Sequence, residues 1–228
     1  MKRAAPDANR HGRWYNDACG TAFALEILGE RWALLVLREM MLGPRRFSDL
    51  RAALPGISAK VLTERLAALE GSGVVARQAL PAPGKGQAYC LTAWGEAAEP
   101  LVQELGRWAA QSSAHNPRLP LSAVSLMLSL RTMLDREACA KAAGTVGFAI
   151  GDEEFVAEPA GRELPIRRGK VKAADAVFRA ASADMVAAGI YAGVPWEELE
   201  AQGALSIEGD RALALRFAGL FRLPPPLA

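Results

Sequence analysis

The hydrophobic and polar positions of the first third of the chain follow a helical period. Apolar residues recur at helical spacing over residues 22–41, and Gly29 divides this stretch into two predicted helices. A short helix is predicted over 47–54, and after a Pro-Gly turn a second one over 58–70.

The segment 58–70 carries the clearest pattern in the chain. Leu62, Leu66 and Leu69 fall on one stripe at spacings of four and three, so this stripe is expected to face the core. Ser58 is a favourable N-cap residue for the helix. The remaining side chains are polar or basic and are expected to face solvent.

The next stretch is predicted to form a β-hairpin. Residues 74–80 and 87–91 are rich in apolar and strand-forming residues, and the segment 81–86 between them is rich in Pro and Gly. Thr92 caps a last helix reaching residue 112, in which Pro100 predicts a kink or an early break. The order of helix, turn, helix and hairpin is that of a winged helix-turn-helix, which presents one helix to the major groove of DNA.

The rest of the chain alternates between strand and helix patterns. Residues 115–120 break the helical period and are predicted to be a linker. Helix and strand patterns then follow in mixed order, which is typical of an α+β layer fold. Helices are predicted over 121–134, 182–191, a short segment from Pro195 or Trp196, and 211–221, and strands over 145–150, 154–158, 164–171, 174–180 and 205–208.

Length and charge sharpen this division. A chain of 228 residues with 51% hydrophobic residues suggests two domains with real cores. The net charge is +2, yet residues 31–65 carry seven basic and three acidic side chains, a net of +4, whereas residues 113–228 carry a net of −1. We therefore predict a flexible N-terminus over 1–13, a DNA-binding domain over 14–112, a linker over 113–120 and a second domain over 121–228.

Other classes of protein find little support in the sequence. The three cysteines form neither a disulfide framework nor a zinc motif, and the two histidines, His11 and His115, suggest no catalytic triad. There is no P-loop, no dinucleotide-binding glycine motif, no apolar run long enough for a membrane span and no signal peptide. We therefore expect a cytoplasmic protein that is not an enzyme, with no catalytic residue, no cofactor and no metal.

A composite motif connects residues 15–110 with a known family. It comprises Cys19, Leu28-Gly-Glu-Arg-Trp32, the run from Leu37 to Leu50, the run from Pro55 to Leu66, and Gly73-Val-Val. This motif resembles the HxlR-type winged helix-turn-helix transcriptional regulators, although Gly20 stands where that family usually has proline. The resemblance implies a dimeric bacterial repressor or activator, with dimerisation through the segment around Trp14 and Tyr15 and through helix 92–112.

A two-fold dimer would present two reading helices about one turn of DNA, ~34 Å, apart, so its double-stranded DNA operator should be nearly palindromic. The candidate DNA contacts lie on the helix 58–70, at the start of the preceding helix and at the tip of the wing. They are Arg45, Arg46, Ser48, Ser58, Lys60, Thr63, Arg65 and Lys85. The alternative for Arg65 is a structural network with Glu64 or Asp49. The alternative for Lys85 is a solvated residue at the tip of a loop.

Cys19 is a candidate redox-sensing residue. The HxlR-type family includes sensors that use a cysteine near the first helix, and a helix N-terminus lowers the pKa of a thiol. The alternative is that Cys19 packs as a small apolar residue. Cys90 and Cys139 are expected to be packing residues.

The second domain, over residues 121–222, resembles the sterol-carrier-protein-like lipid-binding domains. Its most specific piece is the run Gly-x-Leu-x-Ile-x-Gly-Asp at residues 203–210. The resemblance implies an apolar tunnel and a lipophilic effector, and the alternatives are a filled core or a dimerisation scaffold. The candidate lining residues are Leu126, Leu130, Phe148, Met185, Ile190, Trp196, Phe217 and Leu220.

Three functions remain open on the sequence alone. The first is a dimeric transcriptional regulator whose second domain tunes DNA affinity through an apolar ligand or by stabilising the dimer. The second is a lipid or acyl carrier whose winged helix mediates protein contacts. The third is a redox-sensing regulator that uses Cys19.

Overall fold

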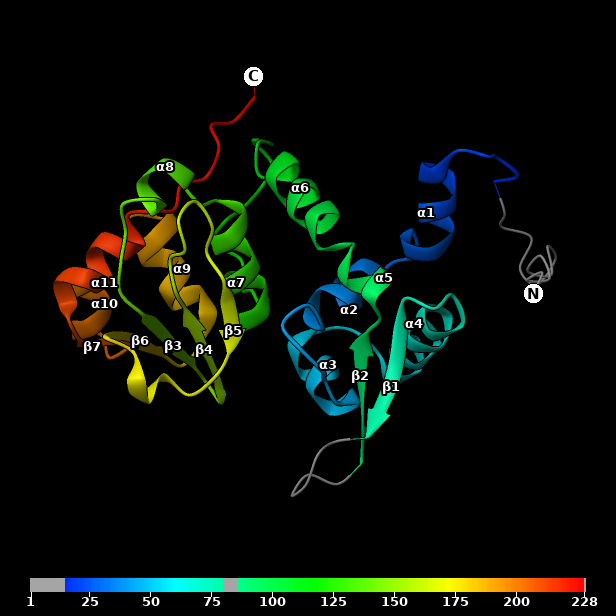
Figure 1. Cartoon of the computed structure of the whole chain (residues 1–228), viewed down its shortest axis with the longest axis horizontal. Coiled ribbons are helices and arrows are strands. Elements are labelled where there is room, and N and C mark those ends of the chain that lie inside the picture. Colours follow the sequence, from blue (N-terminus) through cyan, green and yellow to red (C-terminus); the bar gives the residue numbers. More distant parts are fainter. Residues whose placement is uncertain (1–14, 80–85, 228) are drawn as a thin grey trace.

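The fold is known from a computed structural model that describes residues 15–79 and 86–227 (Figure 1). The first part of the chain is a winged helix-turn-helix in which β1 and β2 pair antiparallel. Its elements are α1 (Gly20–Leu28), α2 (Ala33–Glu39), α3 (Phe47–Ala53), α4 (Ala59–Gly71), β1 (Val75–Ala79), β2 (Gln87–Leu91), α5 (Ala93–Glu96) and α6 (Glu99–Ala109).

Local sequence signals explain where these helices begin and end. Gly29 ends α1, as expected. Ser58 caps α4 by accepting a hydrogen bond from the backbone N–H of Val61 at 3.2 Å, and Thr92 caps α5 in the same way from Gly95. The predicted break near Pro100 is the boundary between α5 and α6, because proline lacks an N–H and is tolerated only in the first turn of α6.

The core of the first domain lies between α2, α3 and α4. Leu62, Leu66 and Leu69 are fully buried, and they pack in one cluster with Val36 and Leu37 of α2. This confirms the leucine stripe predicted from the sequence, and it leaves the opposite side of α4 to solvent.

The turn before α4 depends on two residues with positive φ. Gly56 has φ of +93°, and a Cβ there would lie 3.8 Å from the Trp32 ring. Trp32 itself has φ of +77°, which is rare for a bulky residue. The Trp32 ring therefore lies next to Gly56 of the turn, and the backbone of Trp32 is strained.

The second part of the chain is an α+β domain. The helices and strands predicted from the sequence are present with shifted ends, and α8 and the short 3₁₀ helix η1 were not predicted. The elements are α7 (Ala123–Thr132), α8 (Arg136–Cys139), β3 (Val146–Ile150), β4 (Glu153–Ala157), β5 (Ile166–Arg168), η1 (Val171–Ala173), β6 (Ala176–Ala180), α9 (Ala183–Tyr191), α10 (Trp196–Ala201), β7 (Leu205–Gly209) and α11 (Arg211–Ala218).

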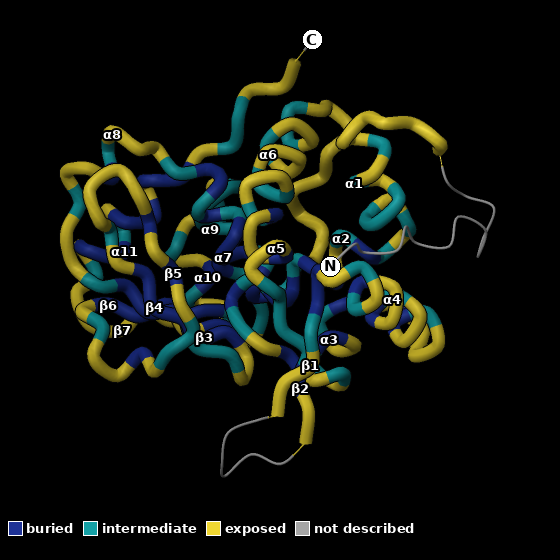
Figure 2. Tube along the Cα trace, turned by 45° about the vertical axis from the view of Figure 1, so that its right-hand side comes forward, coloured by how far each residue is buried: buried dark blue, intermediate teal, exposed yellow. Residues whose placement is uncertain are grey.

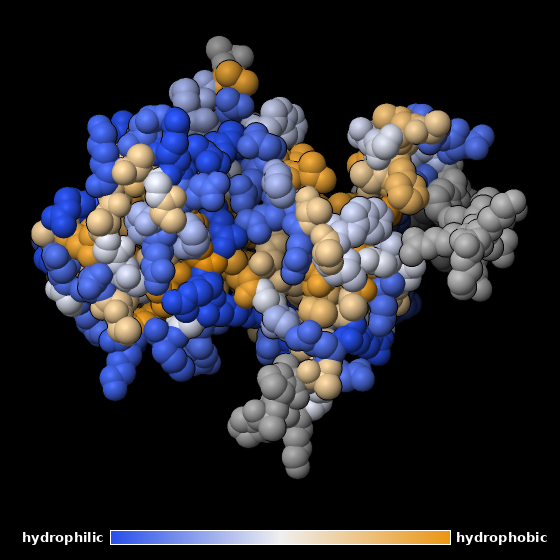
Figure 3. Space-filling view, viewed as in Figure 1, coloured by the Kyte–Doolittle hydropathy of each residue, from blue (hydrophilic) through white to orange (hydrophobic). Residues whose placement is uncertain are grey.

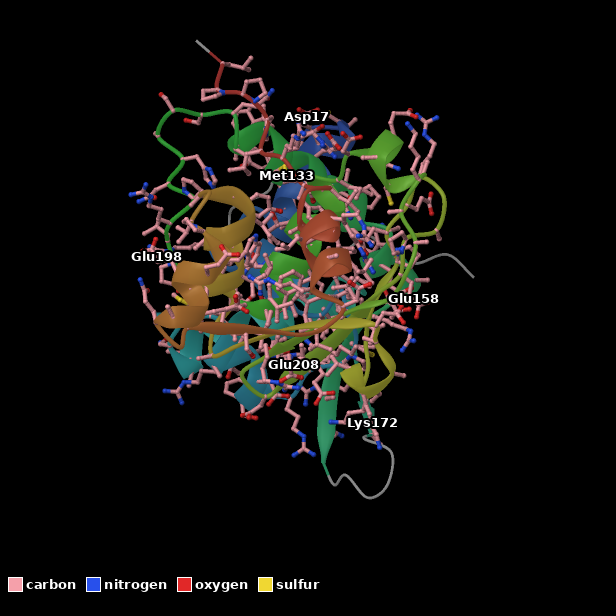
Figure 4. The ribbon with its side chains drawn as sticks, turned by 90° about the vertical axis from the view of Figure 1, so that its left-hand side faces the viewer. Asp17, Met133, Glu158, Lys172, Glu198 and Glu208 are labelled. Atoms are coloured by element: carbon pink, nitrogen blue, oxygen red, sulfur yellow. The ribbon has the colours of Figure 1, made fainter. Side chains whose placement is uncertain are left out.

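These strands form one mixed sheet in the order β5-β4-β3-β6-β7. Only β3 and β6 are parallel neighbours. The helices cover one face of the sheet, whereas Glu208 and Lys172 lie at the other (Figure 4). Gly209, in the motif singled out from the sequence, has φ of +78°, and a Cβ there would lie 2.3 Å from the carbonyl oxygen of Asp175. Only glycine fits this position without a local shift.

The two domains touch mainly through α2 and α6 of the first and α7 of the second (Figure 1). Polar contacts accompany this packing. The Ser122 hydroxyl donates to the buried carboxylate of Glu39 at 2.7 Å, and Arg131 pairs with Glu99 at 2.6 Å. In the described ranges no helix is long and apolar enough to cross a membrane.

Candidate nucleic-acid interface

The outer side of α4 is the centre of the candidate interface. Ser58, Lys60 and Thr63 are exposed there. The Thr63 hydroxyl donates to the carbonyl oxygen of Ala59 at 2.9 Å, so its oxygen still has a lone pair for a DNA donor. Lys60 is an exposed cation, and no hydrogen-bond or ion-pair partner for it lies among the residues that the structure describes. The exposed side of α4 therefore offers the ammonium group of Lys60 and two hydroxyl groups to a groove, beside the exposed carboxylate of Glu64.

The N-terminus of α3 adds a second group of exposed residues. The Asp49 carboxylate accepts hydrogen bonds from the backbone N–H of Arg46 and from the hydroxyl of Ser48, each at 3.1 Å. This holds the start of α3 in place and leaves the Arg46 side chain exposed. In the described ranges neither Arg46 nor Lys60 has an ion-pair partner, so both cations are available to phosphates.

Arg65 is less available than the sequence suggested. Its guanidinium lies 3.4 Å from the carboxylate of Glu30, and its Nε is buried. The structural alternative for Arg65 is therefore present, but its partner is Glu30, in the turn between α1 and α2, rather than Glu64 or Asp49. Arg65 connects α4 to the preceding helix pair.

Arg45 occupies a different place from the one predicted. Its side chain is buried and pairs with Glu153 on β4 of the second domain, which also pairs with Arg168. Its backbone exchanges two hydrogen bonds of 2.8 Å with Tyr89 of β2. The expectation of a phosphate contact fails for Arg45 in this arrangement, because the second domain already provides its counter-charge.

The two arginines and the burial of Glu153 shift its pKa in opposite directions. Burial acts to raise it, but the hydrogen bonds and charges of Arg45 and then of Arg168 outweigh that effect and hold the pKa below its ordinary value. The carboxylate is therefore ionised and acts as the anion between two cations that belong to different domains.

The wing is described only at its base. Lys85, the predicted contact at the tip, lies outside the described residues. Arg77 on β1 was not among the predicted residues; it is 3.1 Å from Glu70 at the end of α4 and stacks over the Tyr89 ring. A lone arginine in the middle of a predicted strand was the only signal for it. This residue fixes the wing relative to α4.

The three cysteines differ in exposure. Cys19 is exposed at the N-terminus of α1, where the backbone N–H groups of Thr21 and Ala22 lower the pKa of its thiol. Cys139 is buried, and burial raises the pKa of its thiol. Cys90 is half-buried on β2. Within the described residues, no three His, Cys, Asp or Glu side chains lie close enough together to hold a metal ion.

The eight residues predicted to line a lipid tunnel belong to the core of the second domain. Phe148 stacks on Phe178 with ring centroids 5.5 Å apart, and Phe217 and Trp196 pack against these two rings. Met185, Ile190 and Trp196 are partly buried against this cluster; Leu126, Leu130, Phe148, Phe217 and Leu220 are buried within it. This close packing of side chains between sheet and helices favours the filled-core alternative.

The first domain has clear relatives. A family described as HxlR-like helix-turn-helix matches residues 27–117. The regulator YvaP and the regulator YodB, both of Bacillus subtilis, are each 41% identical to this chain over 88 residues, which is 39% of this chain and 82% and 79% of the relatives.

YodB is also among the solved structures that the chain resembles. The reduced form of YodB shares 37% identity, covers 43% of this chain and 97% of its own, and has a TM-score of 0.39. YodB has also been solved bound to a quinone and after treatment with diamide.

These relatives are named as transcriptional regulators, which confirms the expectation of a regulator and not an enzyme. Most of their length aligns with the winged helix-turn-helix described above. The chain therefore belongs to the HxlR-like helix-turn-helix family of DNA-binding transcriptional regulators.

Proposed function

We propose that the chain acts as a homodimer that binds a nearly palindromic operator with α4 in the major groove. The observation that carries this proposal is the exposed side of α4, where Lys60 forms no ion pair with any described residue and the leucines are buried beneath. Lys60 and Thr63 would contact bases or phosphates, and Arg46, Ser48 and Ser58 would contact the backbone of the DNA. Arg65 would act mainly by holding α4 in place.

A second copy of the chain is the occupant proposed for the apolar side of α1 and α6. Neither helix has a buried residue, and both stay yellow and teal along their length in Figure 2. Trp108 is 70% exposed, and Figure 3 shows hydrophobic surface beside α6. The exposed apolar side chains are Tyr15, Phe23, Leu25, Leu101, Leu105 and Trp108. Trp14, also predicted to contribute, lies outside the described residues.

Two arguments support dimerisation through this surface. Helices that each expose several large apolar side chains to solvent favour association with a partner. A pseudo-palindromic site matches a two-fold dimer, because each half-site then meets the same α4.

The second domain is proposed to tune DNA binding. Its helices cover one face of a mixed sheet, which supports the sterol-carrier-like assignment from the sequence. A lipophilic effector acts on DNA affinity only if it binds the DNA-competent arrangement with a different affinity from the other one.

The test is a gel-shift titration on the DNA upstream of the chain's own gene. We expect specific binding that weakens steeply with salt, because phosphate contacts release counterions. Lys60→Ala should weaken it by about 1–3 kcal/mol if Lys60 reads a base, and should lower the salt slope by about 1 if it contacts a phosphate. Lys141→Ala, which removes an exposed lysine from the second domain, is the matched control. Equal binding by both variants removes Lys60 from the interface.

A second candidate function is redox sensing through Cys19. It is supported by the exposed thiol with its lowered pKa at the start of a helix that lies on the proposed dimer surface. YodB, the 41% identical relative, has structures in reduced, quinone-bound and diamide-treated forms. Diamide should change operator binding by the wild type and by Cys90→Ser but not by Cys19→Ser. A response that survives in Cys19→Ser rejects this function.

A further inference from the structure

A cavity of about 650 Å³ lies between the two domains. One side is formed by α2 and α6 of the first domain, and the other by α7, α9 and the connecting segment near residues 114–121. Apolar side chains dominate its wall, among them Leu34, Leu35, Val102, Leu128, Met133 and Leu223. Its volume lies within the range of about 300–1,000 Å³ typical of sites for small molecules, which favour domain junctions.

Small residues on α6 create this space. Gly106 faces the cavity together with Ala109 and Ala110. A Cβ built on Gly106 would have no atom within 4 Å, so nothing from the protein fills the position in front of it. Glycine inside a helix is unfavourable by about 0.5–1 kcal/mol relative to alanine. Gly106 is exposed, so a large side chain at this position would extend into the open part of the cavity.

A pair of hydroxyl groups provides the polar end of the cavity. The hydroxyl of Ser129 donates to that of Tyr191 at 2.9 Å, and both residues line the wall. The proton of Ser129 forms the hydrogen bond between the two hydroxyl groups. The proton of the Tyr191 hydroxyl is therefore available to an acceptor on a ligand. Burial raises the pKa of Tyr191, which keeps its hydroxyl protonated.

The arginine that lines the cavity is already paired with a carboxylate. This residue is Arg38, whose Nε and Nη2 donate to Glu39 at 3.0 and 2.7 Å. Burying an ionic ligand beside this neutralised arginine would leave that ligand's charge without a counter-ion. An uncharged ligand avoids this cost.

We infer that this cavity binds an uncharged, largely apolar small molecule with a hydrogen-bond acceptor that receives the free proton of the Tyr191–Ser129 pair. The inference rests on the proposed DNA-binding function, because the ligand is then its effector. It places the effector between the domains rather than in the filled core of the second domain. Of the exposed apolar residues of α6, Leu105 lines the cavity and Leu101 and Trp108 do not, so the cavity borders the proposed dimer surface at Leu105.

The position of α2 gives the ligand a route to DNA. Leu34 and Leu35 face the cavity, whereas Val36 and Leu37 pack with the buried leucines of α4. A ligand that shifts α2 relative to α7 therefore acts on the helix that carries the DNA-reading residues.

The test uses Nile red, an uncharged apolar dye with a carbonyl acceptor, and the full chain. Wild type and Gly106→Ala should bind it saturably with similar affinity. Gly106→Phe, which fills the cavity, should weaken binding by about tenfold or more. Tyr191→Phe should weaken it by about two- to tenfold, the range of one hydrogen bond. Nile red should change operator affinity of the wild type but not of Gly106→Phe.

Circular dichroism shows whether each variant is folded, and light scattering shows its oligomeric state. The inference is overturned if the wild type shows no saturable binding, if Gly106→Phe binds like the wild type, or if Gly106→Phe changes only the oligomeric state, which would make a second copy the occupant. Bound dye with no effect on operator affinity overturns the effector role. If the variants alter dye binding as expected while no variant binds operator DNA, the proposed function fails and the ligand site stands.

Discussion

Replacing Glu153 by glutamine tests the connection between the two domains. The carboxylate of Glu153 lies between Arg45 and Arg168, and the three side chains are 24%, 9% and 27% exposed. The glutamine keeps the shape of the side chain and removes its charge, which leaves two partly buried arginines near each other without an anion. Breaking a buried pair costs about 3–5 kcal/mol, and partial exposure reduces this to about 2 kcal/mol.

This free energy is large enough to measure. For a protein of this size, 1 kcal/mol shifts the unfolding temperature by about 2–4 °C, so Glu153→Gln should lower it by about 4–8 °C. Arg45→Gln should have a similar effect. The double variant should be less destabilised than the sum of the two single variants, because both single variants remove the same Arg45–Glu153 interaction. Scanning calorimetry measures all three shifts.

Operator binding by the same variants separates the two roles considered for Arg45. If Arg45 serves to hold the domains together, Arg45→Gln and Glu153→Gln change operator affinity equally. Our reasoning is refuted if Glu153→Gln leaves the unfolding temperature unchanged, or if Arg45→Gln alone abolishes operator binding. In the second case Arg45 contacts a phosphate, as the sequence suggested.

Three further predictions concern the stability of the fold. Because the pKa of Glu153 is lowered in the native state, its ionised carboxylate stabilises the fold at a pH above 4.5, the ordinary pKa of a glutamate, and this stabilisation is lost as the pH falls below 4.5. Urea unfolding at pH 6 and pH 3.5 should show this loss of stability in the wild type and a smaller loss in Glu153→Gln. Leu66→Ala, at a fully buried site, should cost about 2–5 kcal/mol in urea unfolding, whereas the exposed Ala67→Ser should cost less than about 0.5 kcal/mol. Gly209→Ala should destabilise the second domain by more than about 1 kcal/mol, because a Cβ would meet the carbonyl oxygen of Asp175; Gly203→Ala, with a similar φ but open space, separates the contact from the backbone strain.

The features that the sequence predicted well are those that depend on neighbouring residues. The stripe of Leu62, Leu66 and Leu69 fixes which side of α4 is buried, and Ser58 fixes where the helix starts. Both signals lie within one or two helical turns of the residues they organise. The exposure of Lys60 and Thr63 follows directly from them.

The features that the sequence missed depend on the contact between the domains. Arg45 is separated from Glu153 by 108 positions, and nothing near either residue indicates the other. The same holds for the cavity, whose walls come from four helices and the connecting segment. The apolar residues of the second domain were assigned to a tunnel by resemblance, but spacing alone does not distinguish the wall of a tunnel from a filled core.

The way the second domain attaches is compatible with both proposed interactions of the first. Its main contacts are made by α2 and α6 with α7, and the Arg45–Glu153 pair adds a contact at the base of the wing. The exposed side of α4 stays available to DNA, and the apolar stripe of α1 and α6 stays available to a second copy. Because α2 packs against α4 on one side and lines the interdomain cavity on the other, the second domain can change DNA binding through α2 without covering the DNA-reading surface.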